Sequence, residues 1–326
     1  MIKRLIKNCV LWLYWYPTRA FMNLLPSFLM YRAAAYCGDL HRVLSPKKQH
    51  CLQAEYQFLA EVASPEEPLD YAIRQSYVQH FQNDFEMFRY KFMTAENVDQ
   101  YIICKGIEHL DHALAKQRGV MLTFGHLGAN KMVMAAIGHR GYPMNQFSTP
   151  PTVWIEKRVD RDMRGMSGRD MELRWEADCQ LPSNLINIFG SLRPAYRCLK
   201  NNEVLGVAID GPGGKRKIEL DWNGHQAVFS LGPMDLALRT GAAVLPIYTL
   251  REPSGRNILI IEQEITSSRK ETSEDLTRAV VERHAAQALA HPSYYLEFMA
   301  WRRFMNMIDG TGLFVEYENS SWQKIF

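Results

Sequence analysis

A histidine flanked by glycines is the first residue whose type and setting suggest catalysis. The apolar run Val120–Phe124 predicts a buried strand, and the loop after it reads Gly125-His126-Leu127-Gly128. A histidine at a strand end, ahead of a predicted helix, can face a cleft and serve as a base near neutral pH. The glycines permit close backbone approach, which suits an anionic group. A lone histidine is more often structural, so both interpretations stay open at this point.

A second glycine-rich loop follows the next predicted strand, Val204–Ile209. This loop reads Asp210-Gly211-Pro212-Gly213-Gly214-Lys215-Arg216-Lys217. Because open α/β sheets bind ligands beyond the carboxyl ends of their strands, we expect Asp210 and His126 to face one cleft. The Walker phosphate-loop pattern fails, since Ile209 replaces its first glycine and Arg216 its hydroxyl residue. A tight surface turn with solvated charges is the competing interpretation.

These loops need a scaffold of strands and helices to position them. Further short apolar runs occupy Val244–Tyr248 and Ile258–Ile261, and helical stretches lie between the runs. Such alternation predicts an α/β fold with a mostly parallel central sheet flanked by helices. Helices are also expected within residues 44–95, which lack glycine, and from about Ser273 to Leu289. The charge-dense interval Glu156–Asp178 predicts a solvated helix and loop over the sheet edge.

The first 31 residues have the composition of a membrane-attaching segment. Residues 1–38 carry a net charge of +5, without a single acid, in a chain whose net charge is +3. Pro17 and Pro26 interrupt the apolar stretch, so we expect no straight transmembrane helix. Its aromatic rings and cations suit the headgroup region of an anionic membrane, and we predict interfacial attachment. A cleaved signal peptide and an ordinary buried first helix are the alternatives.

The overall composition excludes several other classes of protein. With 326 residues, 47% hydrophobic and 22% charged, the chain is neither disordered nor a polytopic membrane protein. Its small net charge argues against a broad nucleic-acid-binding surface, so no nucleic-acid partner is expected. The six cysteines lie far apart and indicate neither a disulfide framework nor a zinc site. Dinucleotide-binding, zinc-protease and nucleophile-elbow motifs do not occur in the sequence.

Four segments in a fixed order resemble the lysophospholipid acyltransferase superfamily, in particular its lipid A acyltransferase branch of lauroyl and myristoyl transferases. The segments are Gly119–His126, Ala208–Gly214, Leu231–Ala242 and Val244–Ile247. The resemblance covers most of the chain. It includes the basic aromatic start, the lead-in Gly106–Leu110, and the closing His291-Pro292 with Trp301-Arg302-Arg303.

The resemblance implies an enzyme at the cytoplasmic face of the bacterial inner membrane. It would transfer an acyl group from a carrier thioester, such as that of acyl carrier protein, to a hydroxyl of lipid A or a related glycolipid. No metal or redox cofactor would be needed. An interfacial anchoring segment, residues 1–31, would precede an acyltransferase-like α/β domain, residues 32–326.

The resemblance also assigns roles to individual residues. In this family the histidine of an H-x-x-x-x-[DE] motif takes the proton of the acceptor hydroxyl, and the acid supports the imidazolium. His126 matches the base, Asp210 the acidic position after the second strand, and Arg164 the arginine of an R-x-x-x-G motif. Arg164 and Arg216 are the candidates for binding an anion. The substrate-binding residues expected are Gly125, Asn130, Lys131, Gly211, Gly213 and Arg216.

The lysine at position 131, where the family has Asp or Glu, is a departure that leaves three outcomes open. A cation beside the histidine disfavours a charged imidazolium. Asp210 or another acid could supply the missing partner; the donor could differ, as in relatives that transfer glycine to lipid A; or the chain could be a non-catalytic lipid-binding homologue. A carboxylate within hydrogen-bond reach of His126 would favour catalysis. A soluble thioesterase or hydrolase is disfavoured, because no nucleophile motif is present.

Overall fold

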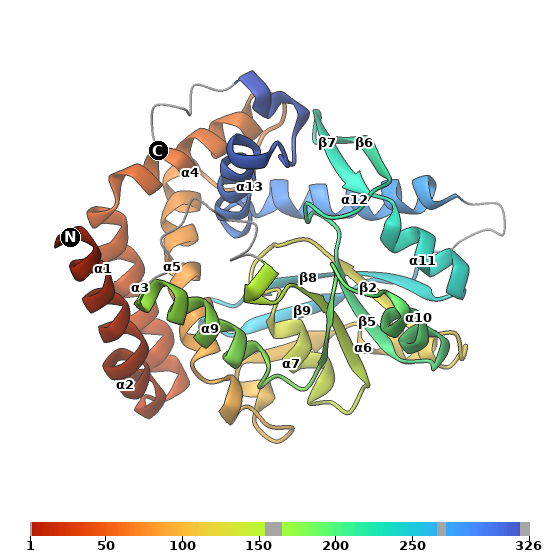
Figure 1. The fold of residues 1–326 in the computed structure, drawn as a ribbon, viewed down its shortest axis with the longest axis horizontal. Helices are drawn as coiled ribbons and strands as arrows, with labels where there is room; N and C mark the ends of the chain where they lie inside the picture. The colour runs from red at the N-terminus through yellow and green to blue at the C-terminus, as the bar shows by residue number, and fades with distance from the viewer. Residues whose placement is uncertain (1, 154–164, 266–271, 320–326) are drawn as a thin grey trace.

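A seven-stranded sheet forms the centre of the computed structural model, which describes residues 2–153, 165–265 and 272–319 (Figure 1). The strand order is β1-β9-β8-β2-β5-β3-β4, and every neighbouring pair is parallel except β8 with β9. The predicted α/β fold with a mostly parallel sheet is therefore confirmed. The strands are β1 Ile102–Lys105, β2 Val120–Phe124, β3 Met144–Ser148, β4 Asn184–Asn187, β5 Val204–Ala208, β8 Ala243–Arg251 and β9 Asn257–Ile261.

Helices cover both faces of the sheet, so the central strands β2 and β5 are buried along almost their whole length and consist mainly of apolar residues. Alternate side chains of β2 point to opposite faces: Leu122 joins one hydrophobic cluster, and Met121 joins the other. In Figure 1 α7 lies below the sheet and α12 runs above it. One face is covered by α6 (Ile107–Leu114) and α7 (Met132–Gly138), and the other by α10 (Arg193–Lys200), α11 (Gly232–Thr240) and α12 (Ser273–Ala290).

Two elements near the second loop were not predicted from the sequence. The cations after Gly214 do not all lie in a surface turn, because Lys217 begins an antiparallel hairpin. Its strands are β6, Lys217–Trp222, and β7, His225–Ser230. The aromatic tail forms a short 3-10 turn η4, Pro292–Tyr294, and a helix α13, Leu296–Asp309. Buried side chains of the hairpin and of α13 belong to the same hydrophobic cluster as α12.

The N-terminal part of the chain folds into a series of helices that lie beside one end of the sheet (Figure 1). Pro17 lies inside a π-helical turn, Tyr14–Thr18, and Pro26 separates α2 from α3, because proline lacks the N–H that a helix needs. Among the described helices, none is both long and apolar enough to cross a bilayer. The helices are α1 Ile2–Leu13, α2 Arg19–Leu24, α3 Ser27–Leu44, α4 Pro46–Ala60 and α5 Leu69–Met87.

Side-chain hydrogen bonds fasten the first three helices to α5 and to α9, Met166–Asp178. Trp15 Nε1 donates to Asp170 at 2.8 Å, and the Tyr31 hydroxyl donates to Glu86 at 2.8 Å. Asp170 belongs to α9, which is the described part of the charge-dense interval. That helix is not simply solvated, as the sequence suggested, because it packs against α1 and α5. The expected domain boundary after residue 31 lies inside α3.

Candidate active site

His126 and Asp210 meet because the strands before them are neighbours in register. Phe124 of β2 pairs with Ala208 of β5, and each site residue lies two positions beyond its strand partner. His126 Nδ1 lies 2.7 Å from Asp210 Oδ1, and the His126 backbone N–H donates to Oδ2 at 2.7 Å. The prediction that the two glycine-rich loops face one cleft is therefore confirmed.

The Asp210 side chain is completely buried and accepts three hydrogen bonds. Besides the two bonds from His126, its Oδ2 accepts a bond from the Tyr295 hydroxyl at 3.0 Å. Burial alone would raise the pKa of this carboxyl, but the charge and hydrogen bond of His126 and the nearby His284 hold its pKa well below the usual range. Asp210 is therefore an ionised carboxylate that accepts a hydrogen bond from His126 Nδ1–H.

This tautomer leaves the other ring nitrogen of His126 free to accept a proton. The His126 side chain is 38% exposed, and one face of its ring stacks on Phe298 with centroids 4.2 Å apart. Nε2 has no hydrogen-bond partner among the residues that the structure describes. An imidazole held at Nδ1 by a buried carboxylate and open at Nε2 has the arrangement of a general base.

A cavity of about 320 Å³ opens beside His126. Four residues predicted to bind substrate lie on its wall, namely Asn130, Lys131, Gly211 and Gly213. A Cβ atom at Gly211 would meet nothing within 4 Å, so the wall is open at that position. The rest of the lining is largely apolar and includes Phe124, Met134, Phe147, Ile188 and Phe189.

Lys131 is not an uncompensated cation beside the base. Its Nζ donates to Asp178 Oδ2 at 2.6 Å, and both residues line the cavity. Asp178 ends α9, so the partner comes from the segment that follows the predicted Arg164 motif. The family's acid at position 131 is thus replaced by an ion pair, while Asp210 is the carboxylate within reach of His126.

Two of the described residues predicted to bind substrate, Gly125 and Arg216, do not line this cavity. Gly125 has a packing role, since a Cβ there would lie 1.9 Å from the His284 ring, whose Nε2 is 3.6 Å from Asp210 Oδ2. The exposed Arg216 guanidinium binds Asp235 at 2.8 Å instead of an open site. Arg164 lies outside the described residues.

Several residues around the pair were not identified from the sequence. Asp210 or His126 is contacted by His284 of α12, by Tyr295, which directly precedes α13, and by Phe298 of α13, each more than 70 positions away in the chain. None belongs to a recognisable motif, although Tyr295 lies in the aromatic tail that the sequence displays. Within the described ranges, no group of three His, Cys, Asp or Glu side chains could hold a metal ion.

Comparison with known proteins agrees with this geometry. The chain is 25% identical over 238 residues to a phosphatidylinositol mannoside acyltransferase of Mycobacterium tuberculosis, a match that covers 71% of this chain and 69% of the relative. It is 24% identical over 233 residues to the protein of the same name from Mycolicibacterium smegmatis, over 70% and 71% of the two chains. The model of the family described as bacterial lipid A biosynthesis acyltransferase matches residues 3–305. The protein is therefore an acyltransferase that belongs to the bacterial lipid A biosynthesis acyltransferase family.

Proposed function

We propose that this lipid acyltransferase transfers an acyl group from a carrier thioester, such as that of acyl carrier protein, to a hydroxyl of lipid A or a related glycolipid. The observation that carries the proposal is the His126–Asp210 pair beside a largely apolar cavity. The matched mycobacterial relatives are named for a mannoside of a phospholipid, which is also a lipid with sugar hydroxyls.

In the proposed reaction His126 is the base and Asp210 is its support. Nε2 takes the proton of the acceptor hydroxyl while the oxygen attacks the thioester carbonyl carbon. The negative charge of Asp210 stabilises the resulting imidazolium through the 2.7 Å bond at Nδ1. The tetrahedral intermediate then collapses, the C–S bond breaks, and the imidazolium returns its proton to the departing thiolate. Both substrates are neutral at the reacting atoms, so the site needs to move only one proton.

The cavity wall suggests how the two substrates are held. The apolar side chains Phe124, Met134 and Ile188 suit the first carbons of an acyl chain. Lys131 and Asn130 offer donors on the same wall and suit a phosphate or sugar oxygen. The anion-binding role of Arg164 stays a prediction, because this residue lies outside the described part of the chain. Arg216 would have to break its ion pair with Asp235 to bind an anion.

Mass spectrometry of lipids from cells with and without this protein tests the reaction class. A lipid A species heavier by one fatty acyl unit is the expected difference. A gain of one aminoacyl unit would instead establish a glycyl-type donor, and no difference would favour the non-catalytic homologue. With purified protein, His126→Ala should lower the transfer rate on the order of 10²–10⁴-fold. A rate close to that of the wild type would show that His126 is not the base.

We also propose that the N-terminal helices hold the enzyme on the cytoplasmic face of the bacterial inner membrane. Large apolar side chains lie exposed along α1 and α2, including Leu5 at 63%, Phe21 at 57% and Leu24 at 82%. Exposed apolar area of this extent is typical of an interaction surface. The exposed face does not stop at residue 31, because Tyr36, Leu40 and Val43 continue it along α3.

Sedimentation with anionic liposomes tests this attachment. Deleting residues 1–31 is unsuitable because Trp15 and Tyr31 are buried in the body. We expect Leu5→Ser with Phe21→Ser to weaken binding more than ten-fold, since each buried side chain contributes about 1.5–3 kcal/mol. Val62→Ser with Phe92→Ser is the matched control, because these side chains are similarly exposed elsewhere. Equal binding by the two double variants would exclude the proposed membrane face.

A further inference from the structure

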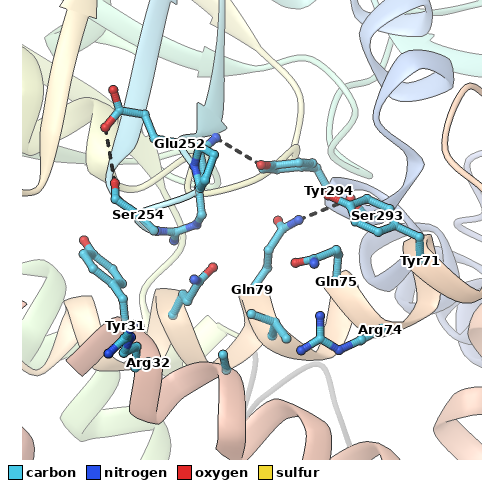
Figure 2. A pocket seen from close by; sticks show the side chains of 16 residues that line it. Tyr31, Arg32, Tyr71, Arg74, Gln75, Gln79, Glu252, Ser254, Ser293 and Tyr294 are labelled. Atoms are coloured by element: carbon cyan, nitrogen blue, oxygen red, sulfur yellow. Dashed lines mark hydrogen bonds between the residues drawn. The ribbon is translucent and has the colours of Figure 1, made fainter. Parts of the chain in front are cut away.

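A second and larger cavity, of about 430 Å³, lies between the N-terminal helices and the β8–β9 turn (Figure 2). Its walls come from α3, from α5, from the turn around Ser254 and from η4. In the described part of the chain it shares no lining residue with the cavity beside His126. Its size falls within the roughly 300–1,000 Å³ of small-ligand pockets.

Three glutamine amides line one side of this cavity. Gln75, Gln79 and Gln82 follow one another at spacings of four and three residues, so they share one face of α5. Figure 2 shows Gln75 and Gln79 projecting from that helix, between Tyr31 on one side and Tyr294 on the other. Gln79 donates to Ser293 Oγ at 3.3 Å. Gln75 and the buried Gln82 have no hydrogen-bond partner among the described residues, so a polar occupant would satisfy their amides.

The charges around the cavity leave one cation available. Arg251 is paired with Glu86 at 2.7 Å, and Arg74 binds both oxygens of Asp39 at 2.7 Å. The lining carboxylate of Glu252 is neutralised by Arg256 at 2.8 Å. The exposed Arg32 guanidinium has no ion-pair partner in the described ranges. The occupant that best complements this lining therefore carries an anionic group, and a guanidinium is well suited to bind a phosphate.

The position of Arg32 places this cavity next to the exposed apolar face. Arg32 lies four residues after Phe28 and four before Tyr36 on α3, and those two side chains are 60% and 76% exposed. If α1 to α3 contact the membrane, as proposed above, Arg32 lies at the level of the lipid headgroups. The location of the site at the bilayer rests on that proposal, whereas its polar lining does not.

We infer that this cavity is a second binding site, which takes the phosphate-bearing, polyhydroxylated headgroup of a membrane lipid. Arg32 binds the phosphate, and the amides of Gln75 and Gln82 bind hydroxyl groups as donors and acceptors. The Tyr71 hydroxyl, which has no partner among the described residues, adds one more group of the same kind. A lipid bound in this cavity does not contact the acyl-transfer residues His126 and Asp210.

Calorimetry with the full-length protein and myo-inositol 1-phosphate tests the headgroup chemistry. We expect Arg32→Gln to weaken binding at least about ten-fold, and Gln75→Ala to weaken it by less. Lys7→Gln is the matched control, since it removes one exposed N-terminal charge away from the cavity. Inorganic phosphate alone should bind more weakly than the inositol phosphate. No binding of the inositol phosphate, or equal binding by Arg32→Gln and Lys7→Gln, would overturn the inference.

Vesicles distinguish a lipid headgroup from a free sugar phosphate. Phosphatidylcholine vesicles with added phosphatidylinositol should bind the wild type more tightly than Arg32→Gln. Arg32→Gln should also lose more binding than Lys7→Gln, which removes one cation from the same proposed membrane-attaching segment but away from the cavity. If Arg32→Gln weakens only the soluble probe, the ligand is a free sugar phosphate, and the lipid assignment is wrong. His126→Ala should bind both probes like the wild type, so failure of the proposed catalysis would leave this result unchanged.

Discussion

Two completely buried carboxylates, Glu86 and Asp210, contact very different partners. Glu86 accepts hydrogen bonds from Tyr31 at 2.8 Å, from Arg251 at 2.7 Å and from Asn257 at 2.6 Å. Asp210 accepts bonds from His126 and Tyr295. The side chain of Arg251 is only 4% exposed, whereas that of His126 is 38% exposed.

This difference distinguishes an ion pair that stabilises the fold from a pair that can transfer a proton. Arg251 keeps its charge at every accessible pH, so Glu86 and Arg251 together tie α3, α5 and the β8–β9 hairpin to one another. His126 can exchange a proton, and its second nitrogen opens to a cavity. A buried carboxylate thus indicates catalysis only when its partner is titratable and exposed to a place where substrate can bind.

Of the substitutions that test this difference, Asp210→Asn should have the largest effect, and that effect is on the transfer rate. The substitution removes the negative charge that supports the imidazolium, and we expect the transfer rate to fall on the order of 10²–10⁴-fold. The rate should be measured on protein whose fold has been checked by circular dichroism. A variant with nearly the wild-type rate would show that Asp210 does not support the base.

Glu86→Gln should instead lower stability and leave catalysis intact. Arg251 would remain buried without a counter-charge, which should reduce the free energy of unfolding by about 3–5 kcal/mol. Urea unfolding measures this loss, and the transfer rate per folded molecule should stay unchanged. Glu252→Gln, in the more exposed pair with Arg256, is the control and should destabilise far less. A Glu86→Gln variant with unchanged stability and a reduced transfer rate would contradict the assignment of Glu86 to stability and Asp210 to catalysis.

Reversing the charges of the Lys131–Asp178 ion pair tests what this pair does on the cavity wall. Lys131→Glu would place two carboxylates on one wall, and we expect a loss of rate of about ten-fold, equivalent to about 1.4 kcal/mol. The double variant Lys131→Glu with Asp178→Lys restores an ion pair in the reverse sense and should recover most of the rate. The double variant still carries an ammonium on this wall, so if it stays as slow as the single one, the ammonium must lie at position 131 itself to bind substrate.

The smallest expected effect concerns stability in acid. Because the pKa of Asp210 is lowered in the folded protein, its contribution to stability is complete above the unfolded carboxyl pKa of about 3.9 and is lost as the pH falls further. The free energy of unfolding should therefore fall below about pH 4, and less steeply in Asp210→Asn. Chemical unfolding at a series of pH values measures both slopes, and equal slopes would contradict the linkage.

Local patterns in the sequence determined the framework of the site. Apolar runs predicted β2 and β5, and the glycine-rich loops after them placed His126 and Asp210 at strand ends. These features were predictable because strand periodicity and turn chemistry depend on residues close together in the chain. The basic and aromatic composition of the N-terminal segment can likewise be recognised without any knowledge of the fold. The strands β1, β3 and β4 of the central sheet escaped prediction, because β1 is only four residues long and the sequences of β3 and β4 mix polar with apolar residues.

Only the tertiary structure decided which groups surround these two residues. The partner of Lys131 lies 47 positions away, and Tyr295 reaches Asp210 from 85 positions away. Arg216 appeared available in the sequence, but the fold pairs it with Asp235. The second cavity combines α3, α5 and a turn that are far apart in the chain. Such contacts depend on strand order, helix packing and the burial of charge, which no short stretch of sequence contains.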